Sequence, residues 1–116
     1  MEKSLIITIV NKGNHDLVLI AARNAGAKGG TITTARGTQN PDVARRYGIN
    51  IQPEKEMIYM VVDNNIKDKV MNAIYSEAGL KSQGAGITFS LPIIDAIGLN
   101  PFEEENEESE NTKKEK

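Results

Sequence analysis

The chain alternates between short runs rich in β-branched apolar residues and longer segments in which apolar residues recur every three or four positions. The first pattern is typical of strands and the second of amphipathic helices. Strands are expected at residues 4–10, 31–36, 56–62 and 87–91, and Pro92 is expected to end the last one. Helices are expected to begin at the capping residues Asn14 and Asp63-Asn64-Asn65 and to end at Gly26 and Gly79.

Each helical segment carries one apolar stripe. The residues of the first stripe are Leu17, Ile20, Ala21 and Ala25, and those of the second are Ile66, Val70, Ile74 and Ala78. Residues at this spacing share one helix face, so each helix is expected to pack that face against a sheet.

The same pattern of glycines between a helical segment and a strand occurs twice. Residues 25–33 end a helical segment, turn on glycines and enter a β-branched run, and residues 78–88 do so again. The order is therefore β-α-β, a long loop and β-α-β. Because crossovers are right-handed, this order predicts an α+β, ferredoxin-like βαββαβ sandwich, with a four-stranded, mostly antiparallel sheet and two helices on one face.

The first strand is apolar on both faces. Leu5, Ile7 and Ile9 alternate with Ile6, Thr8 and Val10, whereas two helices can cover only one face of the sheet. Self-association through the other face is the economical explanation.

Residues 37–54 form the longest stretch without apolar periodicity, with a short helical turn expected at 42–47. Loops between elements of a small domain usually have about 2 to 6 residues, and longer ones are often functional. This loop and its base are also rich in cations, namely Arg36, Arg45, Arg46 and Lys55, which can hold phosphate or carboxylate. Solvated loop charge is the alternative.

Composition limits the class of protein. The chain has 116 residues, enough for one domain, and no cysteine, which excludes disulfides and thiolate metal sites. No apolar run reaches the length that spans a bilayer, and Met1-Glu2-Lys3-Ser4 leads into a strand without a signal-peptide layout, so a cytoplasmic location is expected. Residues 103–116 hold seven acids and three lysines and are expected to form a disordered tail behind a mildly basic domain at 1–102.

Two glycine turns precede strands and can present backbone N–H groups to an anion. These are Gly29-Gly30-Thr31 and Gly84-Ala85-Gly86. A tight helix-to-strand connection is the structural alternative for both. Neither turn follows a strand and opens a helix, so neither is a P-loop or a dinucleotide fingerprint.

Catalytic and metal chemistry find little support. His15, the only histidine, stands beside Asp16 at a helix start, where a solvated or capping role is the expectation, and no serine has a recognisable histidine partner. There is no credible zinc ligand set. Four cations with one nearby aromatic, Tyr47, make no nucleic-acid-binding stripe on a negatively charged chain.

Taken in order, these motifs resemble the PII nitrogen-regulatory signalling proteins. The resemblance covers residues 4 to about 99 and is carried by the Gly-Gly-Thr-Ile-Thr strand, the long loop from Arg36-Gly37, Pro53 before the third strand, and Gly84-Ala85-Gly86-Ile87-Thr88-Phe89. It implies a non-enzymatic homotrimer that binds nucleotides between subunits and reports ligand state through the 37–54 loop, the T-loop of that family, to a partner such as a membrane transporter or a metabolic enzyme.

The resemblance also implies site residues. Gly84, Ala85 and Gly86 correspond to the phosphate-binding B-loop, Thr31 to the threonine beside the adenine, and Lys55 loosely to a lysine at the T-loop base. Gly30, Arg36 and Gly37 complete the expected ligand site for an adenine nucleotide (ATP, ADP or AMP) or another small anion, with no metal. Arg45, Arg46 and Tyr47 are the expected partner-binding residues.

The chain departs from the family pattern at the phosphate site. Ile87 follows Gly86 where a basic residue is typical, Ala85 stands where an aspartate is common, and residues 95–101 lack the usual arginines. The 37–54 loop is also several residues shorter. Two other hypotheses stay open: a CutA-like trimer with a metal-binding or structural role, and a small hydrolase whose base is His15 or a carboxylate.

Overall fold

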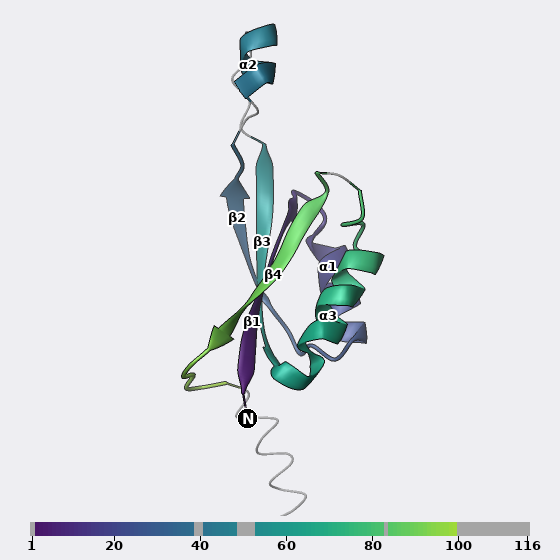
Figure 1. Ribbon diagram of the computed structural model, residues 1–116, viewed down its shortest axis with the longest axis vertical. Helices are drawn as coiled ribbons and strands as arrows, with labels where there is room; N and C mark the ends of the chain where they lie inside the picture. The colour runs from purple at the N-terminus through teal and green to yellow at the C-terminus, as the bar shows by residue number, and fades with distance from the viewer. Residues whose placement is uncertain (1, 39–40, 49–52, 83, 100–116) are drawn as a thin grey trace, which may run out of the picture.

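The computed structural model describes residues 2–38, 41–48, 53–82 and 84–99 (Figure 1). Its elements are β1 (Lys3–Asn11), α1 (His15–Asn24), β2 (Thr31–Arg36), α2 (Pro41–Tyr47), β3 (Glu54–Asp63), α3 (Asn64–Glu77) and β4 (Gly86–Ile93). All four expected strands and both long helices are present, and the short helical turn expected at 42–47 is α2. The acidic tail at 103–116 lies outside the described residues.

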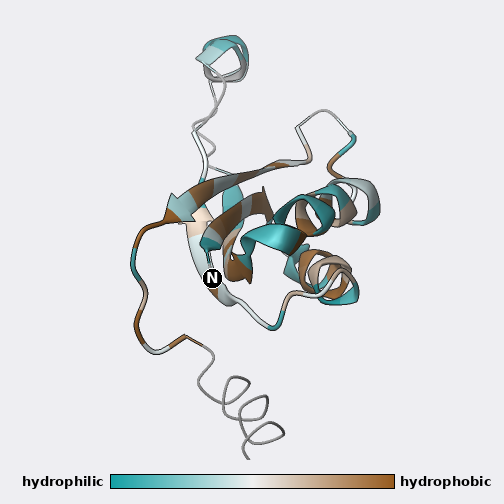
Figure 2. Cartoon of the chain, turned by 60° about the horizontal axis from the view of Figure 1, so that its bottom comes forward, coloured by the Kyte–Doolittle hydropathy of each residue, from teal (hydrophilic) through white to brown (hydrophobic). Residues whose placement is uncertain are grey.

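The strands form one antiparallel sheet in the order β2-β3-β1-β4. In the register, Ile7 of β1 lies between Tyr59 of β3 and Phe89 of β4. Helices α1 and α3 pack side by side on one face of this sheet (Figure 2). The predicted ferredoxin-like α+β fold is therefore confirmed, with every strand pair antiparallel.

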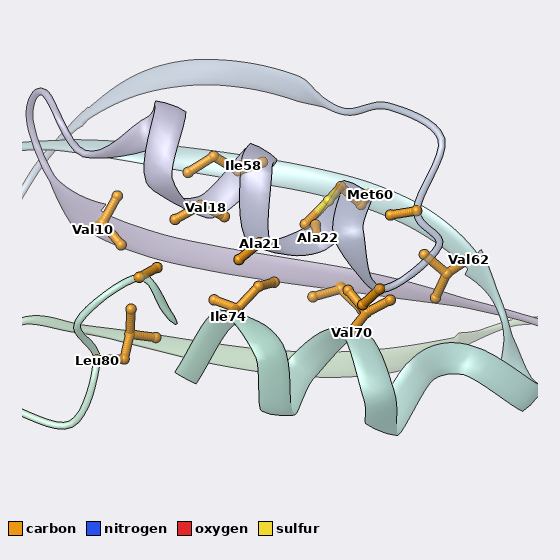
Figure 3. Packing of buried hydrophobic residues seen from close by; sticks show 14 residues of the cluster. Val10, Val18, Ala21, Ala22, Ile58, Met60, Val62, Val70, Ile74 and Leu80 are labelled. Carbon is orange, nitrogen blue, oxygen red and sulfur yellow. The ribbon is translucent and has the colours of Figure 1, made fainter. Parts of the chain in front are cut away.

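The core lies between this face and the two helices (Figure 3). Alternate strand residues point into it, as the period of two requires. Its most deeply buried side chains are those of Ile6, Thr8, Val10, Val18, Ile58, Met60, Val70 and Ile74. The hydroxyl of Thr8 is satisfied there, because it lies 2.9 Å from the hydroxyl of Thr88 on β4.

The stripe predicted for α3 is confirmed, whereas the stripe predicted for α1 is partly wrong. Val70, Ile74 and Ala78 are buried and Ile66 packs against the core. On α1, Leu17 and Ile20 are 50% and 55% exposed, and the buried side consists of Val18, Ala21, Ala22 and Ala25. Residues 17–22 are apolar without interruption, so the sequence pattern alone does not select the side that meets the sheet.

The predicted helix ends are confirmed, but the predicted side-chain caps are not. Gly26 ends α1 with a positive φ of 113°, and the N–H of Ala27 donates to the carbonyl of Ala22 at 2.9 Å, which satisfies the last turn. Neither Asn14 nor Asp63 makes a side-chain cap hydrogen bond. The carboxylate of Asp63 instead pairs with Lys3 at 2.5 Å.

Pro92 does not end the fourth strand, contrary to expectation. It lies within β4 and is the register partner of Ser4 on β1. Because β4 is an edge strand with a neighbour on one side only, a residue without an N–H is tolerated there.

The other face of the sheet is apolar, and no helix among the described residues packs on it. We call it the open face. Its residues on the three strands β1, β3 and β4 are Leu5, Ile7, Ile9, Met57, Tyr59, Val61, Ile87, Phe89 and Leu91. Those of β1 are half-buried, and those of β4 are between 36% and 55% exposed. Within one chain this face is therefore only partly covered.

Candidate functional site

The base of the 37–54 loop is held by the last residues of β2 and the first of β3. Arg36 is the register partner of Glu54, and the N–H of Gly37 donates to the carbonyl of Pro53 at 2.7 Å. A β-carbon at Gly37 would lie 3.1 Å from Cε of Lys55 and 3.2 Å from Cγ of Pro53, so the backbone passes close to both side chains. The structure thus brings the predicted residues Arg36, Gly37 and Lys55 together.

A hollow of about 320 Å³ lies at this loop base. Its lining contains three cations and one carboxylate, with Lys12, Thr34, Ala35, Arg36, Glu54 and Lys55 as the residues concerned. The surplus of positive charge suits a small anion.

A second hollow, of about 430 Å³, lies at the opposite end of β2. Gly30, Thr31, Tyr59 and Leu99 are among the residues that line it. A β-carbon at Gly30 would approach Cγ of Met60 to 3.0 Å and the carbonyl oxygen of Tyr59 to 3.1 Å, so the chain passes close to β3 here. Gly30 and Thr31 are therefore separated from Arg36 and Gly37 by the length of β2.

The turn at Gly84, Ala85 and Gly86 leads into β4, on the far edge of the sheet from β2. Gly84 has a φ of +77°, and the N–H of Ala85 donates to the carbonyl of Ser82 at 3.1 Å. Gly86 pairs with Val10 of β1. Strand β1 therefore lies between this turn and Lys55 of β3, and both β1 and β3 lie between the turn and the predicted ligand residues on and beside β2.

The expected partner-binding residues lie on α2, beyond the ends of β2 and β3 (Figure 1). Arg45, Arg46 and Tyr47 are all exposed, and Arg45 reaches Asp42 of the preceding turn at 4.0 Å. They are presented to solvent, as recognition by another protein requires.

The turn between β1 and α1 contacts the start of β3 through an ion pair and a backbone hydrogen bond. Lys12 pairs with the carboxylate of Glu54 at 3.0 Å, and its backbone N–H donates to the Glu54 carbonyl at 3.2 Å. One residue further along β3, Lys55 donates to Oδ1 of Asn11 at 2.6 Å. Contacts between residues more than 40 positions apart thus fix the loop base from the side of β1.

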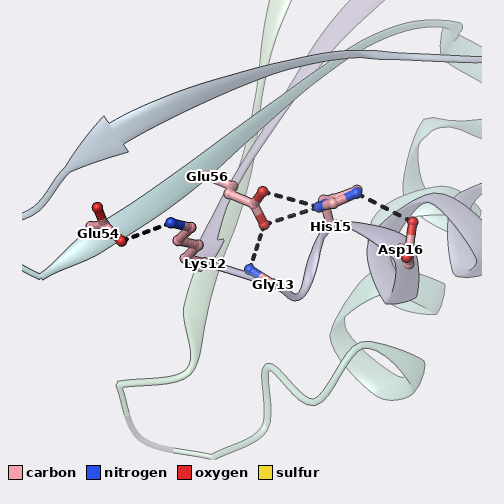
Figure 4. A network of polar contacts seen from close by, with 6 residues as sticks. All are labelled: Lys12, Gly13, His15, Asp16, Glu54 and Glu56. Carbon is pink, nitrogen blue, oxygen red and sulfur yellow. Dashed lines mark hydrogen bonds and ion pairs between the residues drawn. The ribbon is translucent and has the colours of Figure 1, made fainter.

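Glu56, the next residue of β3, also contacts the segment between β1 and α1, and it does so from a buried position (Figure 4). Glu56 is 8% exposed, and its Oε1 accepts a hydrogen bond from the N–H of Gly13 at 2.8 Å. Nδ1 of His15 lies 3.1 and 3.0 Å from the two carboxylate oxygens, while Nε2 of His15 lies 3.3 Å from Oδ1 of Asp16. His15 is therefore neither a helix cap nor simply solvated, because it sits between two carboxylates.

This environment shifts the pKa of Glu56. Burial acts to raise the pKa of this carboxyl, but the hydrogen bonds from His15 and Gly13, with the charge of His15, outweigh it and hold the pKa below its ordinary value of 4.5. The carboxylate is thus the favoured form near neutral pH.

The roles of Glu56 and Gly13, and their contact with His15, were not among the features predicted from the sequence. One signal was available in the alternation of the third strand: residues 56, 58, 60 and 62 share the face that meets the helices, and Glu56 is the only charged residue among them. A carboxylate at an inward position predicts a buried donor close by.

No cluster of three or more histidine, aspartate and glutamate side chains among the described residues has a metal-binding arrangement. Within the same residues, no helix is both long and apolar enough to cross a membrane.

Comparison with known proteins identifies the family. No curated protein sequence matches the chain significantly. Among solved structures, the chain is similar to Arabidopsis thaliana PII bound to citrate, with a TM-score of 0.67 and 24% identity over 86% of this chain and 85% of that one. The family model for nitrogen regulatory protein P-II matches residues 3–103. The chain therefore belongs to the nitrogen regulatory protein P-II family of signal-transduction proteins.

Proposed function

We propose that this protein is a non-enzymatic sensor that acts as a homotrimer. An adenine nucleotide or another small anion binds in clefts between subunits and sets the conformation of the 37–54 loop, which a partner protein recognises. The partner is a regulatory target such as a membrane transporter or a metabolic enzyme. Loop signalling of this kind is a population shift, because the effector stabilises one loop state over another.

One observation carries the proposal: the candidate ligand residues occupy three separate places in one chain. Thr31 lies at one end of β2, Arg36 and Lys55 at the other, and Gly86 on the opposite sheet edge. A single cleft can include all of them only if neighbouring copies contribute.

The open face supplies the means of association. It presents apolar side chains from three strands, including Ile7, Phe89 and Leu91, and no helix of the described residues covers it. Packing this face against other copies removes apolar surface from water at about 25 cal/mol per Å². Trimerisation thus buries the face and joins the separated ligand residues.

The loop geometry supports a reporting role. The anion-favouring hollow at Arg36 and Lys55 lies at the base of the loop, while Arg45, Arg46 and Tyr47 are exposed on α2 beyond it. An effector at the base therefore acts on the segment that carries these side chains.

The decisive experiment is a thermal-shift screen with adenine nucleotides, bicarbonate and 2-oxoacids. Citrate joins the screen because the similar Arabidopsis protein was bound to it. An effector at 100 times its Kd stabilises the folded state by about 2.7 kcal/mol, which raises the Tm by several degrees. Absence of a shift with every compound contradicts the proposal.

Matched variants locate the site. Thr31→Ala is expected to reduce the thermal shift, whereas Thr33→Ala, on the same strand and the same sheet face, is expected to retain it. The double variant Arg45→Glu with Arg46→Glu is expected to bind the effector normally, because these side chains lie on α2, away from both hollows. If the protein instead released phosphate from a nucleotide with turnover, and His15→Ala abolished that release, the result would favour a hydrolase.

A further inference from the structure

The imidazole of His15 lies between two carboxylates that it cannot satisfy in its neutral form. Nδ1 faces both oxygens of Glu56, at 3.1 and 3.0 Å, and Nε2 faces Oδ1 of Asp16 at 3.3 Å. Neutral histidine carries one N–H, so one of its nitrogens then turns a lone pair toward a carboxylate. Only the imidazolium donates to both acceptors.

The two contacts differ in burial. The side chain of Glu56 is 10% exposed and that of Asp16 is 78% exposed. Losing a hydrogen-bond donor costs more free energy for a buried ionised carboxylate than for an exposed one, because water can solvate the exposed carboxylate instead. When His15 is neutral, its remaining proton is therefore expected on Nδ1, toward Glu56, and the contact with Asp16 is lost.

We propose that His15 is a proton-operated clamp on the base of the 37–54 loop. Protonated, it binds Glu56 by a charge-assisted hydrogen bond and holds the turn at Gly13 against β3. Neutral, it binds Glu56 by a weaker hydrogen bond to an uncharged donor, and the turn opens more often. The same turn also pairs with Glu54 through Lys12, and Asn11 just before it accepts a hydrogen bond from Lys55, so the proton changes the stability of the loop base.

The surrounding charges are compatible with this role. Glu56 of β3 and Asp16 of α1 are the groups that pair with His15 in the described part of the chain, and Lys12 and Glu54 pair with each other beside them (Figure 4). The low pKa of Glu56 keeps this carboxyl ionised above about pH 4.5. The proton therefore enters or leaves the imidazole.

The clamp is tested on the effector-free protein by amide hydrogen exchange at pH 5.5 and 7.5, corrected for intrinsic rates. A charge-assisted bond is about twice as strong as a neutral one, so the amides of Gly13 and of residues 54–56 are expected to exchange about fivefold more slowly at pH 5.5. His15→Gln, which cannot titrate, is expected to give equal corrected rates. An equal rate in the parent protein, or a pH effect retained in the variant, overturns the proposal.

A second measurement needs no variant. His15 is the only histidine, so its ring ¹⁵N signals are unambiguous. Both nitrogens are expected to be protonated at pH 5.5 and Nδ1 alone at pH 7.5. A proton on Nε2 at pH 7.5 would remove the hydrogen bond that His15 donates to Glu56 and overturn the proposal. Both measurements omit the effector, so a failed effector screen leaves the clamp intact, and a failed clamp leaves effector binding intact.

Discussion

The carbonyl oxygen of Ile9 lies so close to Gly86 that a β-carbon at residue 86 would stand 2.6 Å from it. Gly86 also has a φ of +157° and begins β4 opposite Val10. The same glycine was predicted from the sequence as part of an anion-binding turn. Its packing provides a sufficient structural reason for glycine, whatever the turn binds.

Gly86→Ala is therefore expected to destabilise the protein by about 3 kcal/mol, because the clash requires the backbone of β1 or β4 to move. Gly84→Ala is the matched control. It has a φ of +77° but open space around its missing β-carbon, so about 1 kcal/mol is expected from backbone strain alone. Chemical denaturation measures both, and equal losses would contradict the packing argument.

The low pKa of Glu56 predicts a loss of stability in acid. The unfolded chain binds a proton at this carboxyl more readily than the folded chain does, so the stabilisation is fully present above about pH 4.5 and disappears as the pH falls through the lower folded-state value. Denaturation of Glu56→Gln from pH 3 to 7 should show a smaller pH dependence than the parent. Glu54→Gln, at an exposed position two residues earlier, should keep the parental dependence, and a flat parental profile would refute the assignment.

Ile74 is the core position that best tests the packing of α3. It is fully buried, so Ile74→Ala is expected to lower the free energy of unfolding by about 2–5 kcal/mol. Ile20→Ala on α1 serves as a control, since Ile20 is 55% exposed and a change within about 0.5 kcal/mol is expected. A large loss at Ile20 would mean that α1 presents its other side to the sheet.

Association through the open face is tested at Phe89, the register partner of Ile7. Phe89→Glu places a charge where another copy should pack, so light scattering should report a monomer in place of a trimer. Ile20→Glu adds the same charge on the exposed side of α1 and should leave the mass unchanged. A parent protein that is already monomeric would remove the intersubunit cleft.

Much of the fold follows from the sequence because its strands and helix ends carry strong local signals. The β-branched runs, the stripe of Val70, Ile74 and Ala78 and the glycines after each helix all agree with the structure. The stripe on α1 was misassigned because residues 17–22 are all apolar, so only tertiary packing selects Val18 and Ala22 over Leu17 and Ile20.

The candidate site was less predictable. Arg36, Gly37 and Lys55 lie close together because β2 and β3 pair as antiparallel neighbours on either side of the loop. The positions of these residues at the two ends of one loop already indicate this proximity. The contact of His15 with Glu56 depends on the register of β1 with β3, which brings together residues 41 positions apart. Local patterns carry no information on that register until the hydrophobic faces of both strands are aligned.

The pairing of Arg36 with Glu54 has an evolutionary consequence. Since the two strands close the 37–54 loop by their own ladder, its ends are fixed by the body of the domain. Changing the length of a closed loop alters the free energy slowly, by about 0.6 kcal/mol for each doubling. Evolution can therefore change the length and sequence of the segment between these two residues at a small cost in the stability of the fold.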